Sequence, residues 1–353
     1  MTDKTLLKPA LMALVIIVTV VTIYENYLRN QNVRISYDDG PAMWADQRAK
    51  ADCLQDERVV FIGSSRIKFA LDIPTWEKQT GLKAVQLAMV GSSPVPVLKD
   101  LGNDLNFKGK LIIDVTEFLF FSNMPQHSDT PNKNINYFHD QTPAQKAGFE
   151  LNQMLESQLV ILDKDNISLN AALDGLQIPS RKGVFMMPIF PLQFDRSTSD
   201  RQSYMTDAFL ASPKEIHQVQ GIWHFFGEMA KAAPPISEME IVEILKTVKL
   251  ATDKIKARGG KVLFLRTPSS GPLAQGEKMG FPKEKFWARL LNETHCYGIH
   301  YEDYLGLNGF VCPEFSHLKL QDATVFTKNL TAILSEKKVW TAPSFKNKNN
   351  LKL

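Results

Sequence analysis

The 353-residue chain has little net charge and lacks the short motifs of several common enzyme classes. Its 41 basic and 38 acidic residues give a formal net charge of only +3, which is too small a surplus to indicate nucleic-acid binding. The sequence contains no metal-ligand cluster, P-loop or dinucleotide fingerprint, so we expect neither a metal nor a cofactor. Gly271 and Gly276 have the spacing of two P-loop glycines, but the Lys-Ser/Thr pair that should follow is missing.

The sequence has one long hydrophobic run, near the N-terminus. Residues 9–24 are uncharged, Lys4 and Lys8 precede them, and Tyr24 and Tyr27 are placed as interfacial anchors. The run does not end in the small residues of a cleavable signal peptide. We therefore predict a transmembrane anchor at residues 1–30, with the N-terminus in the cytoplasm and the remaining chain outside it. A buried core helix is the alternative, and the lack of any polar face argues against it.

Beyond the anchor, the composition is that of a globular protein, with 44% hydrophobic and 22% charged residues. Apolar runs followed by polar loops predict the strands of a parallel sheet. Those strands are expected at residues 59–62, 83–89, 110–115, 261–266 and 299–301. Helices are expected at residues 42–54, 70–80, 94–101, 142–162, 238–256 and 320–334. This alternation indicates an α/β fold with a doubly wound sheet over residues 31–335.

The alternation is interrupted at about residues 122–236, where we see no parallel-strand unit. An insertion of this length, mainly helical by its pattern, is more often a lid or a substrate-binding element than a silent loop. A purely structural subdomain is the alternative. The insertion carries His127, His139, His217 and His224 without metal-ligand spacing, so we interpret each as structural or surface. Residues 336–353 form a basic tail that we expect to be disordered.

The first strand leads into a glycine and two serines, Gly63, Ser64 and Ser65. Taken alone, this pattern is typical of a polar turn. However, ligands bind at the carboxyl edge of such a sheet, and a serine there is held by a rigid strand. Near the end of the chain, Glu314 and His317 lie three residues apart and supply the acid and the base that a nucleophilic serine requires.

These two segments resemble the SGNH (GDSL-type) hydrolase superfamily. In that resemblance Ser65 is the nucleophile, Gly63 the leading glycine, and His317 and Glu314 the base and the orienting acid. The resemblance also implies a flavodoxin-like doubly wound sheet, and it makes Gly91 an oxyanion glycine after the second strand. It covers residues near 56–120 and 259–335.

The sequence departs from the family pattern at two positions. The family usually has aspartate where Glu314 stands. Its third block, a Gly-x-Asn-Asp, is replaced by Val115-Thr116-Glu117, so the asparagine oxyanion donor is missing. Loss of one such donor costs about 10²–10³ in rate, unless a group such as Ser64 or Thr116 replaces it.

Two functions follow from the resemblance. The first is a membrane-tethered serine acyl-ester hydrolase or O-acyltransferase that acts on cell-envelope polysaccharide or another acylated envelope substrate. Anchored proteins of this type resemble the SGNH-like partners of membrane-bound O-acyltransferases, and also the D-alanyl-transfer proteins of teichoic acid synthesis. The second is a catalytically degenerate SGNH-like domain that serves as an assembly or carbohydrate-binding subunit. Labelling of Ser65 by a fluorophosphonate separates the two.

The chain has three cysteines, Cys53, Cys296 and Cys312. In an oxidising compartment disulfides persist, and an odd number leaves at least one thiol free or paired with another chain. Because Cys296 and Cys312 flank the loop that leads to Glu314 and His317, we predict a bridge between them that holds this loop. Three unbridged cysteines that simply pack are the alternative.

Overall fold

The computed structural model describes residues 4–31, 33–53, 57–163, 173, 176, 187–232 and 234–339. The chain divides into two compact units, one of Met1–Asp38 with Pro143–Met187 and one of Asp39–Thr142 with Pro188–Leu353. Part of the predicted insertion thus groups with the N-terminal helix, while the remainder belongs to the unit that contains the sheet. Most of the predicted tail, residues 340–353, lies outside the described residues.

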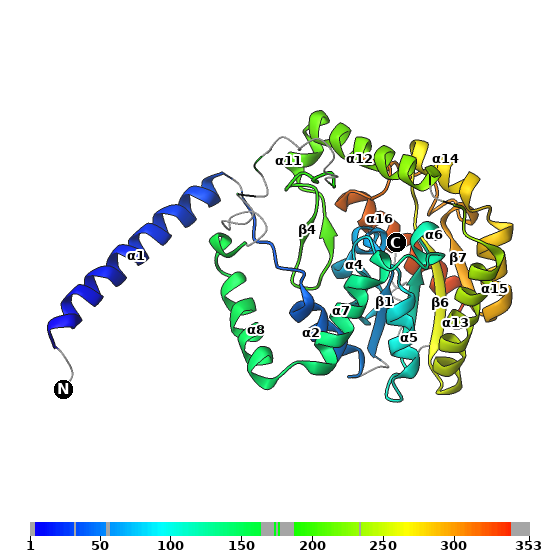
Figure 1. Ribbon diagram of the computed structural model, residues 1–353, viewed down its shortest axis with the longest axis horizontal. Coiled ribbons are helices and arrows are strands. Elements are labelled where there is room, and N and C mark those ends of the chain that lie inside the picture. The colour runs from blue at the N-terminus through cyan, green and yellow to red at the C-terminus, as the bar shows by residue number, and fades with distance from the viewer. Residues whose placement is uncertain are drawn as a thin grey trace, which may run out of the picture. The chain divides into compact units, whose positions relative to one another are not determined.

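The first unit contains the helices α1 (Lys4–Asn30) and α8 (Pro143–Glu156) and the short turn η2 (Val160–Leu162). Leu6–Asn30 of α1 is the one helix among the described residues that is long and apolar enough to cross a membrane (Figure 1). Within Leu6–Asn30, Thr19 and Thr22 donate their hydroxyl protons to the carbonyl oxygens four residues earlier, at 2.8 and 2.7 Å. These bonds satisfy the hydroxyl groups within the helix, as a helix in a membrane requires.

The second unit is built on a five-stranded parallel sheet. Its strands are β1 (Arg58–Ile62), β2 (Lys83–Gln86), β3 (Lys110–Asp114), β6 (Lys261–Arg266) and β7 (Tyr297–His300). They lie in the order β2-β1-β3-β6-β7, and every neighbouring pair is parallel. The parallel sheet and its α/β class are as predicted, although β2 ends before the expected residue 89. The chain winds outward from β1 in both directions, so the winding reverses between β1 and β3, where doubly wound folds bind ligands.

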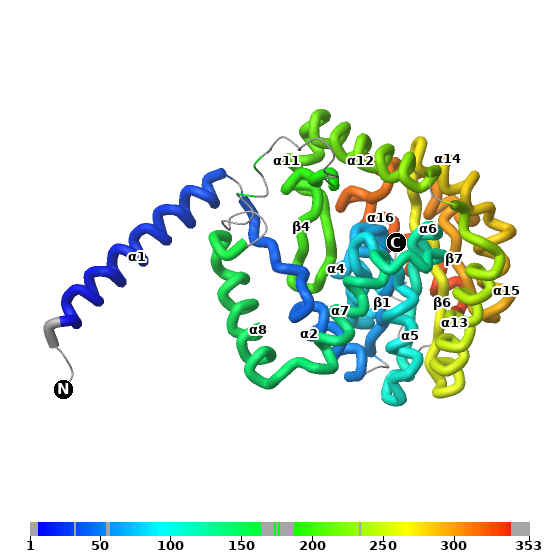
Figure 2. The backbone as a smooth tube through the Cα atoms, viewed as in Figure 1, coloured from blue at the N-terminus to red at the C-terminus, as the bar shows by residue number. Residues whose placement is uncertain are grey.

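Helices cover both faces of this sheet, because alternate strand residues point to opposite sides. Val60 and Ile62 join a core with the helices α2 (Pro41–Ala51), α5 (Val95–Asn103), α13 (Glu238–Ala257) and α15 (Arg289–Thr294). Val59 and Phe61 join the opposite core with α3 (Ser65–Ala70), α4 (Ile73–Thr80) and α16 (Leu320–Glu336). Figure 2 shows the paths of these helices along the strands. The three inner strands β1, β3 and β6 are therefore buried on both faces, which explains their nearly continuous apolar sequences.

The helices α5 and α13 run side by side (Figure 1). A Cβ atom at Gly102 of α5 would lie 3.0 Å from the Cα atom of Ala251 on α13, so glycine permits the close approach. Ser237 and Glu240 form a capping box at the start of α13, in which each side chain accepts from the backbone N–H of the other residue. The predicted helix at 238–256 thus begins where its sequence provides a cap.

Several elements differ from the sequence-based expectation. The helix predicted at 70–80 is α4, which begins only at Ile73 because Asp72 accepts from the N–H of Thr75 and caps it, and the separate helix α3 ends at Ala70. The helix predicted at 142–162 ends at Glu156 and is followed by η2. The insertion also contains the antiparallel strands β4 (Arg196–Ser197) and β5 (Ser203–Tyr204). The remaining elements are α6 (Glu117–Phe120), α7 (Gln126–Asp140), α11 (Asp207–Leu210), α12 (Pro213–Ala232), α14 (Gly271–Gly280), η3 (Glu284–Ala288) and η4 (Tyr301–Asp303).

The predicted disulfide between Cys296 and Cys312 is wrong, because all three cysteines are free. Cys296 packs against the core on the α13 face of the sheet, whereas Cys312 belongs to the core on the α16 face. Strands of the sheet therefore separate the two thiols. Burial raises the pKa of the Cys312 thiol to about 12, so this cysteine is an inert packing residue.

Candidate active site

Ser65, His317 and Glu314 form a connected chain of hydrogen bonds. The Oγ atom of Ser65 lies 2.8 Å from Nε2 of His317, and Nδ1 of His317 lies 3.1 Å from Oε1 of Glu314. Glu314 and His317 are buried, whereas Ser65 is half-buried. The structure thus brings together the three predicted residues, although 252 positions separate Ser65 from His317.

The end of β1 positions Ser65. Gly63 follows the strand and passes so close to β3 that a Cβ atom there would lie 2.7 Å from Cβ of Asp114 and 2.8 Å from a methyl group of Ile67. Ser64 is the N-cap of α3 and accepts from the backbone N–H of Arg66. Ser65 is then the first residue of α3, where the helix leaves N–H groups without helical partners.

A tight turn fixes the orientation of the imidazole. Oε1 of Glu314 accepts from the backbone N–H groups of Ser316 and His317, at 3.3 and 2.6 Å, in addition to its contact with Nδ1. With a proton on Nδ1 for this contact, Nε2 is left to accept from the hydroxyl of Ser65. Phe315, inside the turn, has a φ of 81°, a conformation that costs a non-glycine residue roughly 1–3 kcal/mol. Such strain is common at active sites.

Three aromatic side chains surround the imidazole of His317. The ring centroids of Phe69, Phe194 and Trp223 lie 4.5, 5.6 and 5.8 Å from its own. Phe69 is four residues after Ser65 on α3, whereas Phe194 and Trp223 come from the insertion. The insertion thus supplies part of the wall around the imidazole.

Helix α12 forms hydrogen bonds to the turn at residues 313–317, which we call the acid–base turn, at two points. The indole N–H of Trp223 donates to Oε2 of Glu314, the oxygen that the backbone of the turn does not use. One helical turn earlier, the side-chain amide of Gln220 donates to the carbonyl oxygen of Pro313 at 3.0 Å. Sequence analysis noted the aromatic cluster at 223–226 but not these contacts, because no local pattern links α12 to a turn about 90 residues later.

Ser64 and Thr116, considered as replacement oxyanion donors, bind each other. Their hydroxyl oxygens lie 2.7 Å apart, and the Thr116 hydroxyl lies 3.3 Å from Oδ2 of Asp114. Oδ1 of Asp114 accepts from both the backbone N–H and the hydroxyl of Thr267. Burial raises the pKa of Asp114 to about 6, although Thr267 and Arg266 oppose the rise. The hydroxyl groups of Ser64, Thr116 and Thr267, together with the carboxylate of Asp114, therefore connect the carboxyl ends of β1, β3 and β6.

Gly91, the predicted oxyanion glycine, lies in the turn that follows β2 and has a left-handed φ of 61°. Two residues earlier, the N–H of Met89 donates to the carbonyl oxygen of Gly63 at 3.1 Å. The segments that carry Ser65 and Gly91 therefore leave the sheet side by side.

A buried cluster of charged side chains includes the neighbours of Ser65 and His317 in the sequence. Glu277 of α14 accepts from the guanidinium groups of Arg66 and Arg266, and Arg266 also donates to both oxygens of Glu117. Burial alone would raise the pKa of Glu277, but the two arginines lower it to about 2. The Nε–H of Arg66 also donates to the hydroxyl of Ser316 at 3.3 Å, so the cluster connects the residue after Ser65 with the residue before His317.

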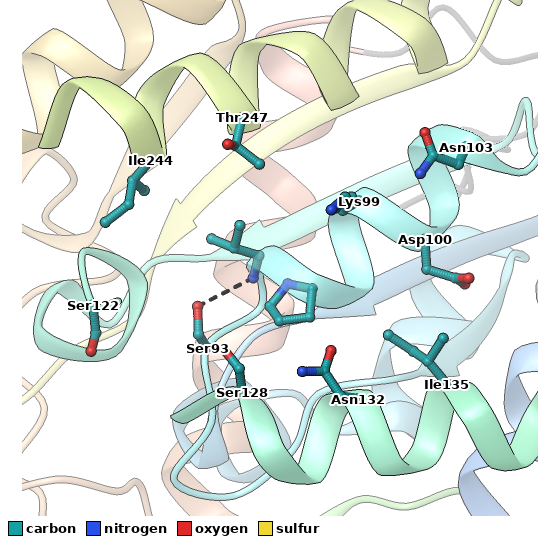
Figure 3. A pocket seen from close by; sticks show the side chains of 12 residues that line it. Ser93, Lys99, Asp100, Asn103, Ser122, Ser128, Asn132, Ile135, Ile244 and Thr247 are labelled. Carbon is teal, nitrogen blue, oxygen red and sulfur yellow. Dashed lines mark hydrogen bonds between the residues drawn. The ribbon is translucent and has the colours of Figure 1, made fainter. Parts of the chain in front are cut away.

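Figure 3 shows a cleft of about 440 Å³ between α5, α7 and α13. Polar groups on its walls include Ser93, Asn132 and Thr247, and none of Ser65, Glu314 and His317 lines it.

Among the described residues there is no group of three or more His, Cys, Asp and Glu side chains that could hold a metal ion. Two of the histidines interpreted as structural have single polar partners: His127 contacts Ser122 at 2.8 Å and His139 contacts Asp100 at 2.9 Å.

No protein-family model matches the chain, and no curated protein matches it. The site must therefore be interpreted from its own geometry.

Proposed function

We propose that the protein is a membrane-tethered serine acyl-ester hydrolase or O-acyltransferase. The observation that carries this proposal is the connected set Ser65, His317 and Glu314, with contacts of 2.8 and 3.1 Å between a half-buried hydroxyl, an imidazole and a buried carboxylate. A serine placed in this way is activated by its base, and the carboxylate stabilises the imidazolium that forms. The resemblance of both segments to SGNH hydrolases agrees with this chemistry.

In the first half of the reaction, the Oγ atom of Ser65 attacks the carbonyl carbon of an ester while Nε2 of His317 takes the hydroxyl proton. The tetrahedral intermediate collapses, the carbon–oxygen bond to the alcohol breaks, and His317 returns the proton to the departing alcohol. The acyl group is then bound to Ser65. The N–H groups of Ser65 and Gly91 are the proposed donors to the oxyanion, since their segments leave the sheet side by side.

In the second half, His317 takes a proton from the incoming hydroxyl group, and the oxygen attacks the carbonyl carbon of the acyl-serine ester. The tetrahedral intermediate collapses, the bond between the acyl carbon and Oγ of Ser65 breaks, and His317 returns the proton to Oγ. Water as the acceptor gives hydrolysis, and a sugar hydroxyl gives transfer. The aromatic wall of Phe69, Phe194 and Trp223 limits the access of water to the imidazole, and exclusion of water favours transfer.

The substrate class follows from the anchor and the resemblance. We propose acylated cell-envelope polysaccharide, or another acylated envelope substrate, with a membrane-bound O-acyltransferase as a partner that supplies or receives the acyl group. The globular part lies outside the cytoplasm in this proposal, and Leu6–Asn30 holds it at the membrane.

The test is covalent labelling of the full-length protein in detergent by a fluorophosphonate. We expect labelling of the wild type and complete loss in Ser65→Ala, with a loss of acyl-ester hydrolysis of up to about 10⁶-fold. Ser335→Ala, at an exposed serine near the end of α16, is the matched control and should label like the wild type. Absence of labelling in a folded wild-type protein would instead support the degenerate assembly or carbohydrate-binding subunit.

A further inference from the structure

Helix α8 of the first unit presents an apolar face that none of the described residues covers. At 3.6 residues per turn, its small and aliphatic residues fall within about one third of the helix circumference. All of them are exposed, and the three largest, Leu151, Met154 and Leu155, are 57, 60 and 42% exposed. The stripe consists of Ala144, Ala147, Gly148, Leu151, Met154 and Leu155. A face of this kind requires an apolar partner.

Three hydrogen bonds join the segment after α8 to the C-terminal part of α1. The carboxylate of Glu25 accepts from the backbone N–H groups of Val160 and Ile161, at 3.0 and 2.9 Å. The guanidinium of Arg29 donates to the carbonyl oxygen of Gln158 at 2.7 Å. The end of α8 is thus fixed to the part of α1 that carries the first charged residues after the apolar run.

This part of α1 is also where a spanning helix would leave the hydrocarbon. The uncharged run ends at Tyr24, and the rings of Tyr24 and Tyr27 stack with centroids 6.2 Å apart. Tyrosines are enriched at the level of the lipid headgroups. Because Gln158 is bonded to Arg29, the C-terminal end of α8 lies at the height of the headgroups when α1 spans the bilayer.

We propose that α8 lies in the interface of the same bilayer that α1 spans, with its apolar stripe toward the acyl chains. The hydrogen bonds to α1 favour the membrane surface as the partner that covers the stripe, because they hold the end of α8 at the depth where amphipathic helices insert. Its 14 residues cover roughly 20 Å of that surface. The opposite side of α8 carries Lys146, Glu150 and Glu156, so the attachment depends on apolar burial and not on anionic lipid. The proposal does not depend on the chemistry of Ser65.

The test uses the full-length protein reconstituted in phosphatidylcholine vesicles. Cys53, which is exposed, and Cys296, which is half-buried, are first replaced by serine, whereas Cys312 is buried and is kept. A single cysteine labelled with an environment-sensitive fluorophore is then introduced on the stripe, as Leu151→Cys or Leu155→Cys. The matched controls Lys146→Cys and Glu150→Cys lie on the exposed polar side of the same helix.

We expect the stripe positions to show blue-shifted emission, quenching by lipids with a doxyl group on the acyl chain, and protection from aqueous iodide. The control positions should show the reverse, and addition of phosphatidylglycerol should change neither result. Equal iodide quenching at Leu151→Cys and Glu150→Cys would overturn the proposal. Protection that grows with the protein-to-lipid ratio, together with cross-linking of Leu151→Cys between chains, would overturn it in favour of a second copy as the occupant.

Discussion

The indole of Trp223 donates a hydrogen bond to the carboxylate of Glu314, 91 positions further along the chain. The backbone of the acid–base turn and the imidazole use only Oε1 of this carboxylate, so Trp223 is the partner of the other oxygen. A carboxylate held at both oxygens is less free to rotate away from the imidazole. The insertion therefore acts on the base through the acid, and Trp223 is a positioning residue for the proposed reaction.

Replacement of Trp223 by phenylalanine tests this role. The variant keeps an aromatic ring against His317 and removes the donor to Glu314. A hydrogen bond to a charged group is worth about 1.5–3 kcal/mol, so we expect kcat for acyl-ester hydrolysis to fall about 10-fold to 100-fold with little change in KM.

Phe190→Leu is the control for packing, because Phe190 contacts the indole at a centroid distance of 5.3 Å and makes no bond to Glu314. It should leave kcat closer to the wild-type value than Trp223→Phe does. An unchanged kcat in Trp223→Phe would mean that the backbone of the turn holds Glu314 by itself.

Glu277→Gln should destabilise the protein strongly. The change leaves the guanidinium groups of Arg66 and Arg266 buried without the carboxylate that they share. Breaking a buried ion pair typically costs about 3–5 kcal/mol, and urea unfolding in detergent measures the loss. Glu228→Gln, which removes an exposed carboxylate paired with Lys231, is the matched control and should unfold like the wild type. Equal stability of the two variants would contradict the role assigned to the cluster.

The same carboxylate predicts a pH dependence at low pH. The pKa of Glu277 is lowered from 4.5 to about 2 in the folded protein, so the unfolded chain binds the proton more readily between these values. The stabilisation by Glu277 is therefore complete above about pH 4.5 and is lost as the pH falls toward 2. Glu277→Gln should lack this contribution, and unfolding curves recorded across the window would show a flatter profile than the wild type.

Asp114 predicts a dependence of the opposite sign. Its pKa is raised from 3.8 to about 6, so the folded protein retains the proton between these values while the unfolded chain releases it. The free energy of unfolding should fall as the pH rises through this window, by up to about 3 kcal/mol. Asp114→Asn removes the titration, so the stability of the variant relative to the wild type should increase from about pH 4 to pH 6. Parallel stability curves for the two proteins would show that Asp114 titrates normally.

The orientation of α1 gives a prediction about cellular location. Lys4 and Lys8 precede the apolar run, and because basic residues are in excess on the cytoplasmic side of membrane helices, we expect the N-terminus to be inside. A phosphatase reporter that requires an oxidising compartment should be active when fused to the C-terminus and inactive when fused before Met1. The reverse pattern would put the sheet domain in the cytoplasm and would rule out an envelope substrate.

Local sequence patterns were sufficient for the strands and for several helices. Four apolar residues before Gly63 predicted β1, and the apolar residues at helical spacing in 238–256 predicted α13, whose N-cap at Ser237 is also a local feature. Each signal is contained in a few neighbouring residues, because burial on both faces selects apolar side chains and an N-cap selects a hydroxyl group. The helix predicted at 70–80 was begun three residues too early, because the cap at Asp72 was not used, and the preceding helix α3 was not predicted.

The sequence by itself determined which groups have the chemistry for a serine-based site: the hydroxyl at Ser65, the imidazole at His317 and the carboxylate at Glu314. Only the tertiary structure decided that the hydroxyl and the imidazole meet at 2.8 Å, that Trp223 holds the acid, and that Cys296 and Cys312 pack against opposite faces of the sheet. The physical reason is that residue type and spacing report local conformation and chemical capacity. The distance between residues far apart in the chain depends on strand order and on the packing of helices against the sheet.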